Sequence, residues 1–138
     1  MMMAVKPGRT RLVMELGMGT DITGSDYTKA ACRAVFNALR QNSLALAPAF
    51  GKSRDDMHCE IVIGVQRPDE VRAEEVAAIL PYGSREVRVE KGGLDTLREG
   101  PDGEHEGFTI LANAAILVHL DLTQADLDRI GVDGSFGR

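Results

Sequence analysis

The residues best suited to chemistry lie in one short segment, Gly17-Met18-Gly19-Thr20-Asp21-Ile22-Thr23-Gly24. Glycine adopts backbone angles that other residues avoid, so the peptide N–H groups of such a segment can converge on one ligand. A helix is expected to begin directly after it, and helix N-termini attract anions. The spacing is neither that of a Rossmann loop nor that of a Walker loop. We expect a site for a small polar or anionic molecule, and a tight turn is the alternative; the site residues would be Gly17, Gly19, Thr20, Asp21, Thr23 and Gly24.

Three side chains beside this segment are candidates for catalysis, without a reaction being implied. Asp21 could orient a ligand hydroxyl or ammonium group, or act as a base, and an Asx turn is the equally weighted alternative. Ser25 and Lys29 are four residues apart, so on a helix they could form a dyad. Such a dyad needs a desolvated lysine, and we favour a capping serine beside a solvated lysine.

A second polar group falls on the outward faces of predicted strands: Glu15, His58, Glu60 and His119. His58 and Glu60 are two residues apart and therefore point the same way. Two ligands do not make a metal site, so we favour an interface or a solvated face. Cys32 and Cys59 form no C-x-x-C pair and are interpreted as free thiols packed in the core. We expect no bound metal and no cofactor.

Composition excludes several classes of protein. The chain has 138 residues, with 16 Lys and Arg against 21 Asp and Glu, which gives a formal charge of −5. Nucleic-acid surfaces need clustered basic residues, and membrane helices need about 20 apolar residues in a row, so neither partner is expected. The first residues are too weakly apolar for a signal peptide, which favours a cytoplasmic location. We expect one domain over residues 1–138, with 1–8 and 131–138 as flexible tails.

Periodicity predicts alternating strands and helices. In the first strand, around Arg11–Leu16, the core face is expected to carry Leu12, Met14, Leu16 and Met18. A helix from Asp26 to Gln41 and a long loop from Asn42 to Asp56 follow. The remaining predicted segments are a strand over His58–Val65, a short helix over Ala73–Leu80, a strand over Glu86–Glu90, a polar loop over Gly100–Gly107 and a strand over Phe108–Leu122. The last strand is long enough to suggest a bulge near Asn113 or a helical stretch over Ala112–Ala115, and Thr123 is expected to cap a final helical turn.

These elements predict an α/β (α+β) fold with a single mixed sheet in the order β-α-β-α-β-β and helices on one face. The uncovered face would carry several apolar residues, among them Val13, Val62, Leu111 and Leu117. A mixed surface of this kind is more easily buried against another subunit than left in water. We therefore expect a homo-oligomer.

The glycine segment also carries a resemblance to a known family. Gly17, Gly19, Asp21 and Gly24 match the signature G-x-G-x-D-x-H-G of the Lin family of conserved hypothetical proteins, with Thr23 where that family has His. The resemblance continues over nearly the whole chain, through Asp26–Ala31, Ile63–Val65, Leu80–Gly83 and Lys91–Leu94. It implies a ligand site at the signature but no reaction, and the departure at Thr23 argues against carrying over a metal or general-base role at that position.

The order of elements is similar to that of the Bacillus-type chorismate mutase fold. That resemblance implies a trimer with ligand sites between subunits, and fold alone does not determine chemistry. Ring-opening hydrolases of cyclic amides look like fused versions of a related unit, so a cyclic amide hydrolase that uses Ser25 and Lys29 is one alternative function. A non-catalytic assembly or regulatory subunit is the other. Whether the protein is an enzyme stays open at this point.

Overall fold

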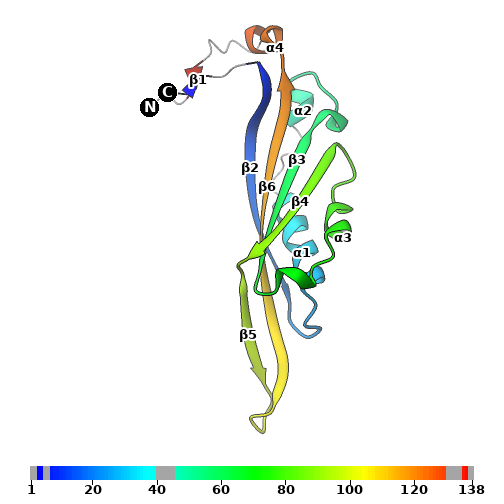
Figure 1. Cartoon of the computed structure of the whole chain (residues 1–138), viewed down its shortest axis with the longest axis vertical. Coiled ribbons are helices and arrows are strands. Elements are labelled where there is room, and N and C mark those ends of the chain that lie inside the picture. The colour runs from blue at the N-terminus through cyan, green and yellow to red at the C-terminus, as the bar shows by residue number, and fades with distance from the viewer. Residues whose placement is uncertain (1–2, 5–6, 40–45, 130–134, 137–138) are drawn as a thin grey trace.

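The computed structural model describes residues 3–4, 7–39, 46–129 and 135–136 and shows a mixed α+β fold (Figure 1). Its main sheet has five strands, and the residues described at the two ends of the chain form a separate two-stranded sheet from β1 (Met3–Ala4) and β7 (Ser135–Phe136). The strands of the main sheet are β2 (Gly8–Asp21), β3 (His58–Val65), β4 (Ser84–Lys91), β5 (Leu94–Glu99) and β6 (His105–Leu122). The helices are α1 (Tyr27–Leu39), α2 (Leu46–Ala49), α3 (Ala73–Ala77) and α4 (Gln124–Arg129), with 3-10 turns η2 (Arg54–Asp56) and η3 (Pro68–Glu70).

The long strand β6 organises the sheet. Its strands lie in the order β2-β6-β3-β4, and β5 pairs with the first residues of β6. Only β3 and β4 are parallel, and the chain between them crosses over through η3 and α3, as a parallel pair requires. The sequence predicted an α/β (α+β) fold with a single mixed sheet, and the structure confirms it at that level. The strand β5 was missed, because its apolar residues Leu94 and Leu97 are too widely spaced for a strand pattern.

Helices α1 and α3 lie on the same side of the sheet (Figure 1). The core forms between them and the inward residues of β3 and β6, which alternate along each strand as the sequence predicted for β3. The most buried of these are Ile61, Ile63, Val65, Ile110, Ile116 and Leu120. The small side chains of Ala30, Ala34 and Ala38 are also fully buried, so α1 lies close to the sheet.

The face of β2 that packs on α1 is the opposite of the one predicted. Met14, Leu16 and Met18 are 56%, 60% and 60% exposed, whereas Gly17 and Gly19 point at the helix. A Cβ atom on Gly17 would lie 2.5 Å from the Ala38 nitrogen, and one on Gly19 would lie 2.7 Å from the Arg33 carbonyl carbon. The prediction that apolar side chains face inward was wrong here because the helix backbone occupies the space that side chains would fill.

A β-bulge in β2 determines which residues of its first half face outward. The register with β6 shifts between Arg11, which pairs with His119, and Val13, which pairs with Val118. Leu12 is thus an extra residue, and a bulge of this kind changes the alternation of side chains along its strand. Arg9 and Arg11 therefore share the outward face with Met14. The bulge predicted near Asn113 of β6 was wrong, because β6 pairs without interruption through that residue.

The end of the sheet opposite α4 is a two-stranded ribbon. The first residues of β6 pair only with β5, and the ribbon extends beyond the rest of the sheet (Figure 1). The predicted polar loop is correspondingly shorter, since His105 already belongs to β6.

Other boundaries differ modestly from those predicted. The long loop expected over Asn42–Asp56 contains α2 and η2, and α1 begins at Tyr27, while residues 40–45 lie outside those described. Asp26 caps α1 by accepting the N–H of Lys29 at 3.1 Å. The cap expected at Thr123 is confirmed, because its hydroxyl accepts the Asp126 N–H at 3.1 Å and the Asp126 carboxylate accepts the Thr123 N–H at 2.8 Å.

Replacing Gly19 with alanine is expected to cost about 3 kcal/mol or more of the free energy of unfolding, because the added methyl collides with helix backbone that cannot move away. Gly64→Ala is the matched control in another strand, since its Cβ would lie 3.4 Å from the nearest atom, the Gly92 Cα. Urea unfolding of the two variants measures the difference. Equal stabilities would contradict the close packing of α1 on β2.

Candidate functional site

The segment in which the sequence placed the ligand site is mostly strand. Gly17, Gly19 and Thr20 lie within β2 and pair with β6, so the expected loop is reduced to residues 22–26. The outward backbone groups of this edge are also partnered: the Met18 N–H donates to the Asn37 side chain at 3.0 Å, and the Arg33 guanidinium donates to the Thr20 carbonyl at 2.6 Å. The peptide groups that were expected to converge on a ligand therefore belong to the sheet and to its contact with α1. Binding at these residues stays a prediction.

Asp21 holds the start of α1 in place. Its side chain is buried, accepts the Asp26 N–H at 2.8 Å, and has an oxygen 3.7 Å from the Arg33 guanidinium. A Cβ on Gly24 would lie 2.6 Å from the Asp21 carboxylate, so glycine leaves room for this group. The geometry favours the structural alternative for Asp21, while Thr23 is exposed. The two strand glycines, Asp21 and Gly24 thus all serve the junction of β2 with α1.

Ser25 and Lys29 do not face each other on a helix. Ser25 precedes α1, has a positive φ of 51°, and its hydroxyl donates to the Phe108 carbonyl at 3.3 Å and accepts the Phe108 N–H at 3.2 Å. The spacing of four residues brings side chains together only when both residues are helical. The dyad on which the cyclic amide hydrolase depends is therefore not assembled.

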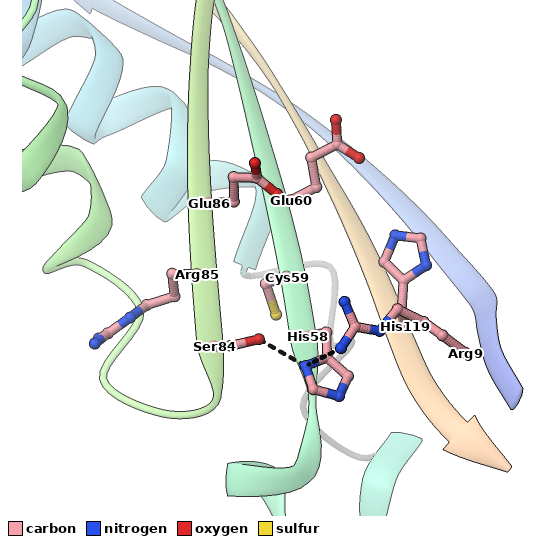
Figure 2. A pocket seen from close by; sticks show the side chains of 8 residues that line it. All are labelled: Arg9, His58, Cys59, Glu60, Ser84, Arg85, Glu86 and His119. Carbon is pink, nitrogen blue, oxygen red and sulfur yellow. Dashed lines mark hydrogen bonds between the residues drawn. The ribbon is translucent and has the colours of Figure 1, made fainter.

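The structure instead brings polar residues together on the outward face of the sheet, near the end where α4 lies. A hollow of about 500 Å³ there is lined by Arg9, His58, Cys59, Glu60, Ser84, Arg85, Glu86 and His119 (Figure 2). The register explains the grouping, because His58 pairs with His119 on one side and with Ser84 on the other. Four neighbouring strands thus contribute to one row, with Arg11 opposite His119 on the far side.

A chain of hydrogen bonds passes through His58. Its Nδ1 lies 2.7 Å from the Ser84 hydroxyl, and its Nε2 lies 2.8 Å from the Asp121 carboxylate. Arg9 reaches the same ring, with one guanidinium nitrogen 3.3 Å from Nδ1, and its Nε lies 3.6 Å from Asp121. The imidazole is therefore held between a hydroxyl and a carboxylate, which is the arrangement used to orient a general base.

Only some of the described charged side chains around the hollow form ion pairs. Glu60 accepts from Arg88 at 2.8 Å, and the same arginine also binds Glu90 at 2.8 Å. Arg85 points away from His58 and donates to the Leu80 carbonyl (Figure 2). Among the described residues, Arg11 takes part in no ion pair. The β2 side of the row therefore presents cationic groups that are not fully compensated.

The pKa values of His119 and Asp121 are shifted by their neighbours in this row. Burial lowers the pKa of His119, Glu60 opposes this effect, and Arg11 and Arg9 add to the lowering. The hydrogen bond from His58 lowers the pKa of Asp121, and the charges of His58 and Arg9 act in the same direction.

Sequence reasoning identified His58, Glu60 and His119 as sharing outward faces but missed Ser84, Arg9 and Asp121. Ser84 joins His58 only because β3 and β4 are parallel neighbours, and Arg9 joins only because of the bulge at Leu12. Glu15, the fourth member of the predicted outward group, is buried instead. Within the described ranges, no three His, Cys, Asp or Glu side chains are arranged to hold a metal ion.

Residues 11–118 match the family model described as conserved hypothetical protein (Lin0512_fam), which covers most of the chain. The chain belongs to this Lin0512 family. The match confirms the resemblance noted from the sequence at the level of the family. A comparison with curated proteins finds no match.

A solved structure is similar to this member of the Lin0512 family. The chain is 35% identical to an FtsZ-like protein of unknown function from Nostoc punctiforme, whose crystal structure superposes with a TM-score of 0.73. The similarity covers 85% of this chain and 100% of that one. In the described part of this family member, no helix is long and apolar enough to cross a membrane.

The hydrogen bond between His58 and Asp121 predicts a titration difference. In His58→Ala, the pKa of Asp121 should rise toward its ordinary value, and in Arg9→Gln it should rise less. Because the folded-state pKa lies below the unfolded value of about 3.9, the stabilising effect is complete above that pH and is lost as the pH falls through the folded-state pKa. Carboxyl ¹³C NMR against pH measures the shift, and an unchanged Asp121 curve in His58→Ala would show that the bond is absent.

Proposed function

We propose that this protein binds a small anionic metabolite in the hollow beside Arg9, Arg11 and His119. The observation that carries the proposal is the single row in which β2, β6, β3 and β4 place the two arginines and His119 next to His58 and Ser84. Arginine is well suited to carboxylate and phosphate groups because its planar fork donates two parallel hydrogen bonds. The hydroxyl and imidazole groups beside it would bind the polar remainder of the ligand.

The location differs from the one expected from the sequence, while the ligand class is the same. The segment Gly17–Gly24 is accounted for by the contact between β2 and α1, and the hollow offers cationic side-chain donors that this segment lacks. The mixed sheet with helices on one face is also compatible with the chorismate mutase-like architecture, which we retain as a proposal. A purely regulatory subunit would not need the hydrogen-bonded group at His58, so ligand binding is favoured over that alternative.

We further propose that the outward face of the sheet associates with other copies of this chain, with a trimer favoured. Met14, Leu16 and Met18 are more than half exposed there, beside the partly buried Val62, Leu111 and Leu117. Their strand edge is unsuited to pairing, because Asn37 and Arg33 already occupy the outward groups of Met18 and Thr20. Side-chain packing against the face would remove the apolar residues from water. Leu117 lies two residues before His119, so a neighbouring copy would border the hollow.

Ligand binding is tested by thermal shift and calorimetry with inorganic phosphate, citrate and a panel of small mono- and dicarboxylates. The double variant Arg9→Gln/Arg11→Gln should bind the best of these about 10-fold more weakly or worse, because charge-assisted hydrogen bonds are lost. Arg72→Gln is the matched control, since Arg72 is similarly exposed and pairs with Glu75 at the start of α3. A ligand that binds the double variant normally but is lost in Thr23→Val would place the site at the glycine segment and contradict the proposal.

Association is tested by light scattering coupled to size exclusion. The wild-type protein should have a mass near three times the chain's 14.9 kDa, and Leu16→Glu/Met18→Glu should reduce it to that of one chain. Phe36→Glu is the control, because Phe36 is 61% exposed but lies on α1, on the other side of the sheet. A wild-type mass equal to one chain would refute the proposed association, and loss of assembly in Phe36→Glu alone would place the interface on α1.

A further inference from the structure

The contact with Arg9 determines how the His58 ring is protonated when all its hydrogen bonds are made. A guanidinium group can only donate, so the Nδ1 atom that lies 3.3 Å from it must accept. The Ser84 hydroxyl, 2.7 Å from the same Nδ1, then donates its proton toward the ring. The proton of the ring is on Nε2, where it is donated to Asp121 at 2.8 Å. This is the tautomer that a general base for a serine hydroxyl requires.

The fold positions Ser84 firmly opposite His58. Gly83 has a positive φ of 76°, and a Cβ there would collide with the backbone of Met57. The turn it makes brings the Ser84 N–H to 2.9 Å from the Met57 carbonyl, which begins the parallel pairing of β4 with β3. Ser84 is the first residue of β4 and is exposed, so its hydroxyl is accessible from the hollow (Figure 2).

We propose that Ser84 is a nucleophile for acyl transfer, with His58 as its general base and Asp121 as the residue that positions His58. The substrate class is a small activated carboxylic ester or thioester. Only the further expectation that it carries a second, anionic group rests on the proposed function, because Arg9 and Arg11 would bind that group. Neither Ser84 nor Asp121 belongs to the Ser25–Lys29 dyad considered from the sequence, so the catalytic group is a different one.

The reaction balances with water as the second reactant. The Ser84 oxygen attacks the acyl carbon while its proton passes to His58 Nδ1, and a tetrahedral oxyanion forms. The guanidinium of Arg9, adjacent to this nitrogen, can donate to the oxyanion. The bond to the leaving group then breaks, and the alcohol or thiol leaves with the proton from Nδ1. Water attacks the acyl-serine, gives a proton to His58, and the carboxylic acid departs as Ser84 recovers its proton.

The experiment uses p-nitrophenyl acetate, a neutral ester whose reaction does not depend on an anion site. The protein should release p-nitrophenolate and carry an acetyl group on the Ser84 peptide after acid quench, as located by mass spectrometry. Ser84→Ala should abolish the adduct, and His58→Gln should slow its formation by about 100-fold. Ser84→Cys should restore acylation through the thiol. Ser53→Ala is the matched control, because the Ser53 hydroxyl caps η2 and has no histidine partner.

Asp121→Asn separates positioning from mere structural support. It should slow acetylation by about 10-fold or more and move the pH–rate profile to lower pH, because the carboxylate that stabilises the protonated imidazole is gone. A structural role alone would lower the rate equally at every pH. Melting temperatures of all variants are measured alongside.

Each outcome decides the question. An acetyl group on a lysine or another serine, or an equal rate in His58→Gln, would overturn the inference, and adduct mapping on the wild-type protein decides even if Ser84→Ala fails to fold. Carboxylate binding without acetylation would refute the nucleophile and leave the proposed function standing. Acetylation of Ser84, with no effect of the arginine variants on anion binding, would refute the proposed function and leave the nucleophile standing.

Discussion

The structure depends on the direct contact between the backbone of β2 and that of α1. Gly17 and Gly19 let the helix lie against the strand with no strand side chain between them. The buried alanines of α1 have side chains small enough to permit the same close approach. Once this contact is made, β2 turns its odd-numbered residues from Val13 onward toward the helix and its even-numbered residues away. Asp21 then caps the connection, and Arg33 and Asn37 occupy the open strand edge. The apolar residues left facing outward are a consequence of this packing.

The same alternation explains why the polar group gathers where it does. Residues two apart on one strand share a face, and so do residues paired across neighbouring strands. His119 and Asp121 of β6, His58 of β3 and Ser84 of β4 therefore come together once the register is set. Each has an ordinary role when taken alone. Together they form a hydrogen-bonded sequence in which a carboxylate, an imidazole and a hydroxyl follow one another.

Most of the elements could be predicted from the sequence, and much of the site could not. The period-two pattern of Cys59, Ile61 and Ile63 and the capping pattern at Thr123 are local signals, and both were interpreted correctly. The inward face of β2 was misassigned because the usual rule assumes that a strand packs through its apolar side chains. The glycines predict a loop because a single sequence does not show whether glycine serves a turn or a close approach. Ser84 and Arg9 depend on strand neighbours and on a bulge, neither of which leaves a clear local mark.

The extra residue at Leu12 divides β2 into two parts in which different positions face outward. Before it, the odd-numbered Arg9 and Arg11 face outward; after it, the even-numbered Met14, Leu16 and Met18 face outward. Loss of Leu12 alone would place Arg11 directly before the inward-facing Val13, so simple alternation would return with both arginines and the apolar residues still facing outward. Pairing Leu12 with β6, without loss of a residue, would instead turn both arginines inward, so their outward position depends on Leu12 staying out of the ladder.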